Sequence, residues 1–598
     1  MTLGARLICD ALHRAGVECV FGLPGTQNVD LFEALRASPL RTIVAVHELS
    51  AAMMANGYFR GSGRPGVLVT IPGPGFTWAL SGLAEASLDS AALLHIVGQP
   101  AREPGERFQL QALDQAAMVR PIVKAVHEIG CAVDAADVVT AAHAQALAGE
   151  PGPVMVQIAR SMLAQQADAV VAVRADGAAR TVDQPAIDEV VRALVTARRC
   201  VIFAGQGANA AADLVVRLAE CVSAAVVTTT SGRGVVPEDH PLSLGFELGG
   251  NGADTFNALI EASDLVLAIG CKFSHNGSRG FQLRIPAEKL IHVDASAGVL
   301  GANYPARLAI QADARAFTLA LLESLAAQRG RPAGFSAEEI VRFRERGRLE
   351  GASDLVEPKI HGIRSGKPEE FFAALRRAMP RSSCLVTDSG LHQVLARRHF
   401  RVLQPRGLMT PTNLQSMGFA IGAAIGACLA DPNRPVVALI GDGGLALSGL
   451  ELLTAVRERI ALTVIVFVDG AYGMIRTQQL AASGHAFGTE FSGPDFAALA
   501  EAVGAAHVRL EGEPEAILRA AIASQRVTIV EVGVGDTFPM HWMRVKGAAR
   551  HMLGSKTKAW LRRFVRRGRK GSVRSDGGAV SNIGQVADRG CQRSGDCK

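Results

Sequence analysis

The segment PVVALIGDGGLALSGLELLTAVRERIALTVIVFVDGAYGM, residues 435–474, carries the pattern that decides the fold. Two strongly apolar runs, PVVALI and LTVIVFV, each lead to an aspartate beside glycine, Asp442 and Asp469. A helical stretch joins the two runs, and a strand–helix–strand unit of this kind is typical of a parallel sheet covered by helices. Ligands of such sheets bind at the carboxyl ends of the strands, where both aspartates are expected.

The same alternation of strand and helix patterns runs through most of the chain. VECVFGLPG precedes NVDLFEALR, and RTIVAVH precedes ELSAAMMANGYFRGS. Polar or charged breaks at 165–184 and 330–367 separate three units. We therefore predict an α/β protein with three doubly wound parallel-sheet domains, at 1–165, 184–330 (Rossmann-like) and 367–535.

Composition agrees with a large globular protein. A chain of 598 residues exceeds a single hydrophobic core, and 48% apolar with 20% charged residues excludes a disordered chain. The longest bland apolar stretch, GFAIGAAIGACLA at 418–430, is too short to span a bilayer. The amino terminus has no cleavable signal pattern, and the ten cysteines include no C-x-x-C pair. We therefore expect a cytoplasmic protein without a zinc site or a disulfide framework.

The net charge of +6 comes from the carboxyl-terminal segment. Residues 544–570 hold eleven Lys and Arg and no acid, so the rest of the chain is mildly acidic and unlike a nucleic-acid-binding surface. Within this tail, KTKAWLRRFVRR at 556–567 has the spacing of an amphipathic basic helix. We predict a basic tail at 540–598, a helix followed by disorder. Contact with an anionic membrane is an alternative that we rank below docking on the protein itself and below disorder of this segment.

The two aspartates suit a metal–phosphate site. Mg²⁺ prefers a few protein oxygens together with phosphate oxygens and water. Asp442, Asp469 and a carbonyl freed by the DGAYG turn would supply those oxygens, and the glycines around Asp442 leave N–H groups for phosphate. Either D-G pair alone is more often an ordinary turn. Their equivalent positions after successive strands favour the metal–phosphate site.

These motifs resemble the thiamine-diphosphate enzymes of the acetolactate synthase and 2-oxoacid decarboxylase group. The signature of that family is G-D-G followed by a turn with Asn or Asp, matched here by GDG and VDG. The resemblance covers about 1–535 and includes FGLPGTQNVDLFEAL, VHELSAA, GRGVVPEDHPLSLG, TDSGLHQ and LQSMGFAIGAAIGA. It implies a pyrimidine-binding, a central and a pyrophosphate-binding domain in that order.

The resemblance also implies roles for single residues. Mg²⁺ would be held by Asp442, Asp469 and the Ala471 carbonyl. The catalytic residues would be Glu48, Gln109 and Met417, of which Met417 supports the bent shape of the cofactor. The residues that bind the cofactor would be Pro24, Glu48, Gly390, His392, Gln415, Met417, Gly441, Asp442, Gly443, Gly444, Ala471, Tyr472, Gly473 and Met474.

Glu48 has a chemical reason for its position in this family. A carboxylate bonded to the aminopyrimidine favours a protonated ring nitrogen, which lets the neighbouring amino group remove the C2 proton of the cofactor. Without the surrounding motif, Glu48 would more simply be an acid at a helix start.

Two positions in the third unit differ from the family pattern: Val468 replaces the usual first Asn of the metal turn, and Leu391 replaces the usual Gln before His392.

The reaction type follows from what the chain lacks. The TIPGPG turn has no His, and Ile475 stands where simple decarboxylases place an acid. Phe108 and Gln109 match acetolactate synthases, whereas Leu110, Gln478 and Trp78 depart from them. We predict an acetolactate-synthase-like carboligase that decarboxylates a 2-oxo acid and transfers the acyl unit to a second carbonyl. The alternatives are a simple decarboxylase of the benzoylformate or indolepyruvate type and a non-catalytic interaction protein on the same fold.

A glycine pattern in the central unit bears on whether the protein binds a second cofactor. VIFAGQGANA at 201–210 is a G-x-G-x-x-A pattern, but no acid stands about twenty residues later to bind a ribose. An oxidoreductase would therefore rest on this pattern alone. The resemblance leaves FAD in the central domain as an alternative to an empty scaffold. It also implies a homodimer or homotetramer with the active site between subunits.

Overall fold

The computed structural model describes residues 1–99, 108–168, 182–245, 253–328, 334–351 and 357–535. Residues Met1–Met540 form one compact unit. The predicted tail at 540–598 lies outside the described residues.

The first domain is built on a six-stranded sheet in which all neighbouring strands are parallel, in the order β3-β2-β4-β5-β7-β6. Its strands are β2 Cys19–Gly22, β3 Arg41–Val44, β4 Gly66–Thr70, β5 Leu93–Gln99, β6 Ala125–Ile129 and β7 Pro153–Ala159. Its helices are α1 Gly4–Arg14, α2 Val29–Arg36, α3 Glu48–Ser62, α4 Pro74–Leu88, α5 Gln115–Val119, α6 Ala135–Leu147 and α7 Arg160–Leu163. A short antiparallel pair, β1 Thr2–Leu3 with β8 Gln166–Ala167, lies beside it.

The third domain repeats this topology. Its parallel sheet has the order β15-β14-β16-β17-β19-β18, so strands of equal rank occupy equal places in the two sheets. The strands are β14 Cys384–Thr387, β15 Leu408–Met409, β16 Val436–Gly441, β17 Thr463–Val468, β18 Ala506–Arg509 and β19 Thr528–Gly533. The helices are α13 Pro368–Ala378, α14 Leu391–His399, α15 Phe419–Ala430, α16 Asp442–Ser448, α17 Leu452–Arg457, α18 Gly473–Ser483, α19 Phe496–Val503 and α20 Pro514–Ala523.

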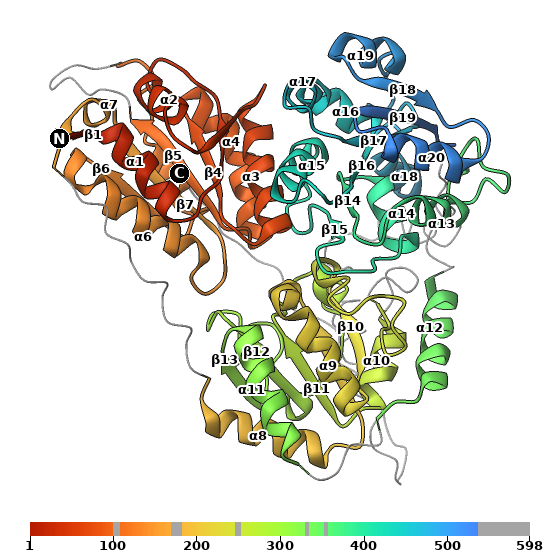
Figure 1. Ribbon diagram of the computed structural model, residues 1–598. Coiled ribbons are helices and arrows are strands. Elements are labelled where there is room, and N and C mark those ends of the chain that lie inside the picture. Colours follow the sequence, from red (N-terminus) through yellow and green to blue (C-terminus); the bar gives the residue numbers. More distant parts are fainter. Residues whose placement is uncertain (100–107, 169–181, 246–252, 329–333, 352–356, 536–598) are drawn as a thin grey trace, which may run out of the picture. The chain divides into compact units, whose positions relative to one another are not determined.

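The central domain has a five-stranded parallel sheet in the order β10-β9-β11-β12-β13, which is the flavodoxin-like order. The strands are β9 Cys200–Ala204, β10 Ala225–Thr228, β11 Leu265–Ile269, β12 Leu290–Asp294 and β13 Leu308–Gln311. The helices are α8 Gln184–Thr196, α9 Ala212–Val222, α10 Asp254–Glu261 and α11 Ala314–Ala326, followed by α12 Ala337–Gly351. Figure 1 shows the three sheets with their helices, and the prediction of three doubly wound α/β domains is confirmed. None of the described helices combines the length and the apolar character needed to cross a membrane.

Helix α3 begins and ends where its sequence predicts. The His47 side chain precedes the helix and accepts a hydrogen bond from the Leu49 N–H at 3.1 Å, which satisfies one of the free amides of the first turn. At the other end Gly63 adopts a left-handed conformation, φ 83°, that stops the helix. Glu48 is therefore the first residue of α3.

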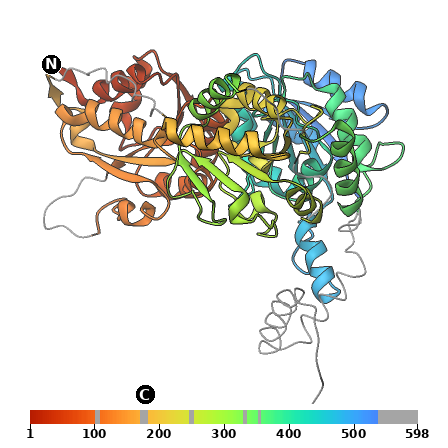
Figure 2. The same ribbon diagram turned by 90° about the horizontal axis from the view of Figure 1, so that it is seen from below.

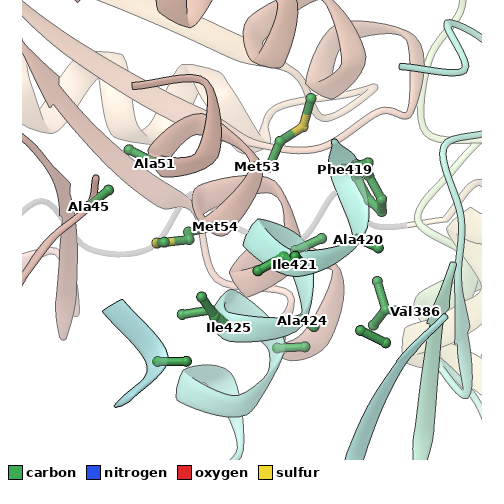
Figure 3. Packing of buried hydrophobic residues seen from close by; sticks show 14 of the residues in the cluster. Ala45, Ala51, Met53, Met54, Val386, Phe419, Ala420, Ile421, Ala424 and Ile425 are labelled. Carbon is green, nitrogen blue, oxygen red and sulfur yellow. The ribbon is translucent and has the colours of Figure 1, made fainter. Parts of the chain in front are cut away.

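The core between the first and third domains is formed by α3 and α15. Figure 3 shows Met53 and Met54 of α3 beside Ile421 and Ile425 of α15, all of them buried. Small residues let the two backbones touch: a Cβ added to Gly426 would lie 2.0 Å from the carbonyl oxygen of Met54. The packing therefore holds the starts of both helices, and with them Glu48 and the segment around Met417, in a defined relation.

Candidate functional site

The third sheet has its topological switch point between β14 and β16. The chain leaves these neighbouring strands in opposite directions, since β14 leads on to β15 and β16 leads on to β17. Such a point leaves a crevice at the carboxyl ends of the strands, where doubly wound proteins bind their ligands. The segments that follow the two strands carry Gly390 and His392, and Gly441 and Asp442.

Asp442 is held by backbone amides at the end of β16. Its Oδ1 accepts from the Gly443 N–H and its Oδ2 from the Gly470 N–H, both at 2.8 Å. The residue is 1% exposed, and burial raises the pKa of its carboxyl above the ordinary value although the amides oppose this. Asp442 therefore ties the end of β16 to the turn that follows β17.

Asp469 lies at that turn, and its carboxyl interacts electrostatically with that of Asp442. Its Oδ1 accepts from the Ala471 N–H at 3.2 Å. Burial, followed by the charge of the Asp442 carboxylate, raises the pKa of Asp469 to about 6. A divalent cation would offset the repulsion between the two carboxylates and lower both pKa values, because its charge favours the ionised form of each acid.

The turn after Asp469 is paired with the segment around Glu490. The Tyr472 N–H donates to the Thr489 carbonyl at 2.8 Å, and the Phe491 N–H donates to the Gly470 carbonyl at 3.0 Å. These bonds flank an antiparallel bridge between Ala471 and Glu490. In such a bridge the two opposed residues turn their own carbonyls away from each other, so the Ala471 carbonyl is not part of the pairing.

At two of the predicted glycines a side chain would collide with residues of the site. A Cβ at Gly473 would lie 2.2 Å from Oδ2 of Asp469, and a Cβ at Gly443 would lie 2.9 Å from the ring of Tyr472. That ring packs on Phe491 with centroids 5.0 Å apart. The cradle around the two aspartates therefore depends on glycine at both positions.

His392 is buried at the switch point, 5% exposed. Its ring lies beside two glycine backbones: Cβ atoms placed on Gly390 and Gly441 would lie 2.9 Å and 3.3 Å from ring atoms. Burial lowers the pKa of His392 to about 4, so the imidazole is neutral at neutral pH. Its Nε2 has no hydrogen-bond partner among the described residues, which leaves a polar atom for a ligand.

The segment before α15 has an uncommon backbone. Gln415 has a positive φ of 65°, and its side-chain amide donates to the Thr412 carbonyl at 3.1 Å. Gly418 is left-handed, and the half-buried Met417 stands between the two. A conformation of this kind needs support from its surroundings.

Asp388 supplies part of that support, and the sequence did not single it out. It follows β14, is fully buried, and accepts from the Gly418 N–H at 3.1 Å and the Ala420 N–H at 3.0 Å. Burial raises the pKa of Asp388 to about 6. Its position after a strand, in TDSG, is the signal that could have identified it.

Glu48 has a buried oxygen without a partner. The residue is 5% exposed, and its Oε2 makes no hydrogen bond within the described residues. Its Oε1 lies 3.0 Å from the place where a Cβ on Gly75 would stand. Leaving a carboxylate oxygen buried and unpaired is costly, so an external donor at this point would be stabilised.

The first domain also has a switch point, between β2 and β4, and Pro24 lies after β2. Asn28 fixes this turn: its Oδ1 accepts from the Gly25 N–H at 2.8 Å and its Nδ2 donates to the Leu23 carbonyl at 3.2 Å. Gln109 is half-exposed, and its neighbour Phe108 is fully exposed. The described contacts therefore support a defined position for Pro24 and do not bring Phe108 into the site.

A cavity of about 410 Å³, which is the size of a small-molecule site, lies between the central domain and the other two. Its lining includes Gly207 after β9, Gly270 after β11, and Lys272. Asp294 at the end of β12 and Asp313 after β13 also reach it. The sequence search for an acid close behind GQGANA missed these two because they come from later strands.

Within the described ranges, no group of three or more His, Cys, Asp and Glu side chains is arranged to hold a metal ion. The candidate metal site is of a different composition, with two carboxylates and a backbone carbonyl.

Three family models match the chain. They are described as the N-terminal TPP binding domain, the central domain and the C-terminal TPP binding domain of thiamine pyrophosphate enzymes, at residues 2–118, 187–321 and 388–532.

Curated relatives match along most of their length. A probable acetolactate synthase large subunit of Methanocaldococcus jannaschii is 30% identical over 559 residues, 90% of this chain and 93% of the relative. The acetolactate synthase large subunit of Lactococcus lactis is 30% identical over 85% of this chain and 88% of the relative. A probable 2-ketoarginine decarboxylase of Pseudomonas aeruginosa is 31% identical over 89% of this chain and 94% of the relative.

Proposed function

Because the chain belongs to the thiamine-pyrophosphate-dependent enzymes, we propose that it is an acetolactate-synthase-like carboligase acting on 2-oxo acids. It would decarboxylate one 2-oxo acid and join the acyl unit to a second carbonyl compound. The acetolactate synthases among its relatives support this choice, and the decarboxylase relative keeps the simple decarboxylase as the alternative.

The residues present fit thiamine diphosphate. When bound, this cofactor supplies a C2 carbanion that adds to carbonyl groups and stabilises negative charge as CO₂ leaves. The observation that carries the proposal is the buried, unpartnered Oε2 of Glu48, which suits a proton shared with a ring nitrogen. His392 would bind the diphosphate through Nε2, and Met417 would contact the cofactor from the segment before α15.

We extend the proposal to the metal. Mg²⁺ would be held by Asp442, Asp469 and the Ala471 carbonyl, which suits a hard cation that prefers oxygen. The raised pKa values of both carboxyls support it, since they indicate that negative charge at this point lacks compensation from the protein. The cation would neutralise the diphosphate and leave Asp442 and Asp469 ionised.

Carboligation is favoured over simple decarboxylation by the side chains around the site. The β4–α4 turn at 71–73 and the first residues of α4, 74–76, carry no titratable group. Ile475, 48% exposed at the start of α18, is also unable to donate a proton. With no acid at these two places, an acyl carbanion equivalent would be left for attack on a second carbonyl compound. Gln109 would lie near that carbon.

The oligomeric state we propose is a homodimer or homotetramer with Glu48 and Asp442 of different subunits at one site. Support comes from apolar side chains that are exposed in the third domain, which are Leu447, Leu450, Leu453, Tyr472 and Phe487. Helix α18 buries only Thr477 within the described chain, and Figure 2 shows it in light blue standing out from its sheet. Light scattering tests this, and an active monomer would refute it.

For the cavity beside the central domain we propose FAD as an alternative to an empty scaffold, because Asp294 and Asp313 offer acceptors for the hydroxyl groups of a nucleotide. The domain bounds 1–165, 184–330 and 367–535, the cytoplasmic location and the helical then disordered tail stay predictions. An absorbance spectrum of the purified protein tests for the flavin directly.

The decisive experiment is a product assay. The purified protein is incubated with thiamine diphosphate, Mg²⁺ and a panel of 2-oxo acids, and CO₂, aldehydes and 2-hydroxyketones are measured. A ligated product supports the carboligase, and free aldehyde in equal yield with CO₂ would replace it by the decarboxylase. Absence of cofactor binding by calorimetry would refute both.

Glu48→Gln separates binding from activation. We expect it to keep cofactor affinity but to slow exchange of the C2 proton at least ~100-fold, since the shape survives while the proton site is lost. The matched control is Glu511→Gln at an exposed position. Unchanged exchange in Glu48→Gln would return this residue to the role of a helix-start acid.

A further inference from the structure

The segment 412–418, which we call the pyrimidine loop, is held by the end of α4. The Thr412 N–H donates to Oδ1 of Asp89 at 3.2 Å, and the Asn413 side chain donates to the Leu88 carbonyl at 3.0 Å. The Ser416 N–H donates to Oε2 of Glu85 at 2.9 Å. One helix of the first domain thus supports the loop of the third domain at three points.

The two carboxylates in this support differ in their partners. Asp89 is paired with Arg60 at 3.0 Å, both of them buried, and Arg60 also donates to the Thr410 carbonyl at 2.9 Å. Arg60 therefore compensates part of the charge of Asp89, although burial still raises the pKa of this carboxyl above its ordinary value. Glu85 is one turn earlier on α4 and fully buried. It accepts from Ser416, and its side chain also interacts with that of Asp89, whereas no cation is paired with it within the described residues.

The hydrogen bond from the Ser416 N–H to Glu85 also fixes the direction of the preceding carbonyl, that of Gln415. A peptide unit is planar and trans, so its N–H and the preceding carbonyl point in opposite directions. Fixing the Ser416 N–H on Glu85 therefore aims the Gln415 carbonyl away from α4. Gln415 needs such control, because its φ of 65° lies in the left-handed region that non-glycine residues rarely adopt.

We propose that Glu85 is a positioning residue of this enzyme, which orients the Gln415 carbonyl toward the aminopyrimidine of the cofactor by accepting the Ser416 N–H. The inference rests on the proposed function in one respect: the pyrimidine loop must be the segment that meets the cofactor ring. Glu85 itself does not touch the cofactor, and its role is exerted through the peptide unit between Gln415 and Ser416.

The positioning depends on pH in the neutral range. Burial, followed by the negative charge of Asp89, raises the pKa of Glu85 to about 7. The other charged groups near this pair are Arg60 on α3 and Lys272 of the central domain, both acting on Asp89; the pyrimidine loop has no titratable side chain. An ionised acceptor forms the stronger hydrogen bond, so the loop is held best above pH 7 and less firmly below it.

Two substitutions at Glu85 test this, with cofactor affinity measured by calorimetry on the full-length protein in Mg²⁺ at pH 6 and pH 8. Glu85→Gln keeps an acceptor of the same shape but cannot ionise. Glu85→Leu removes the acceptor. Ser81→Ala on the exposed side of α4 is the control for substitutions in this helix.

We expect the dissociation constant to fall several-fold more from pH 6 to pH 8 in the unaltered protein than in Glu85→Gln, which keeps only the pH dependence that Asp469 causes in both proteins. Glu85→Leu should weaken binding at least ~10-fold at pH 8, since a hydrogen bond to a charged group is lost. If Glu85→Leu does not fold, the pH profile of Glu85→Gln still decides. A profile shared by Glu85→Gln and the unaltered protein would overturn the positioning role. Absence of cofactor binding in the unaltered protein would instead overturn the proposed function.

A second readout separates positioning from plain stability. Glu85→Gln should lower the rate of C2 proton exchange at pH 8 while its midpoint of thermal unfolding does not fall. A fall in unfolding midpoint together with an unchanged exchange rate of the bound cofactor would assign Glu85 a structural role only, and would refute the proposal.

Discussion

Gly426→Ala is expected to impair activity from a position that touches no ligand. Gly426 lies in α15 where this helix crosses α3, and an added Cβ would stand 2.0 Å from the Met54 carbonyl oxygen and 2.8 Å from the Tyr58 nitrogen. Ordinary contacts of a Cβ lie at 3.4–4 Å, so the two helices must separate by more than ~1 Å. Glu48 begins one of these helices and Met417 lies two residues before the other, so a shift of the helices displaces a residue in each of the two sites to which a chain of the proposed dimer contributes.

The size of the effect follows from that displacement. Overpacking of this kind lowers the free energy of unfolding by ~1–3 kcal/mol. A shift of ~1 Å in the groups that orient a reaction costs on the order of 100-fold in rate. We therefore expect kcat/KM for the 2-oxo acid to fall about 100-fold, while the protein stays folded at 25 °C.

The assay compares Gly426→Ala with Gly130→Ala, since a Cβ at Gly130 meets nothing within 4 Å. Steady-state rates with saturating thiamine diphosphate and Mg²⁺ give kcat/KM, and denaturant titrations give stability. Gly130→Ala should change neither. A Gly426→Ala protein with full activity would refute the idea that contact between α3 and α15 positions the site.

Three further outcomes are expected. The pKa of Glu85 is raised from 4.5 to about 7 in the folded protein, so its contribution to stability is complete below pH 4.5 and is lost as pH rises through 7. Relative to the unaltered protein, Glu85→Gln should therefore gain ~2 kcal/mol of unfolding free energy between pH 5 and pH 8 in denaturant titrations without added cofactor; a constant difference would contradict this. Because the pKa of Asp469 is about 6, Mg²⁺ affinity should fall up to ~10-fold per pH unit below pH 6, and Asp469→Asn should weaken Mg²⁺ binding and remove most of this dependence in metal titrations. Truncation after residue 543 should leave a folded enzyme whose turnover changes modestly; retention of the full chain on anionic vesicles, lost in the truncation, would indicate a membrane role for the tail.

Much of the fold and part of the site could be read from local sequence. Apolar runs that end beside Asp442 and Asp469 indicated parallel strands, because a buried strand must be apolar and its end must meet solvent or ligand. Those two acids do lie after β16 and β17, and Glu48 does begin a helix, as their motifs predicted. Family motifs extended the prediction to residues such as Ala471 and Met417, whose contacts with cofactor and metal stay predictions.

Tertiary structure alone decided which distant groups support those residues. Asp388 holds the amides of Gly418 and Ala420, and Glu85 holds the amide of Ser416 across 331 residues of sequence. No periodicity or motif around Glu85 predicts its bond to Ser416, because a helix of apolar and small residues indicates only a buried helix. The reason is physical: strand and helix patterns depend on neighbours within a few residues, whereas a buried carboxylate is paired by whatever backbone the packing of two domains brings to it.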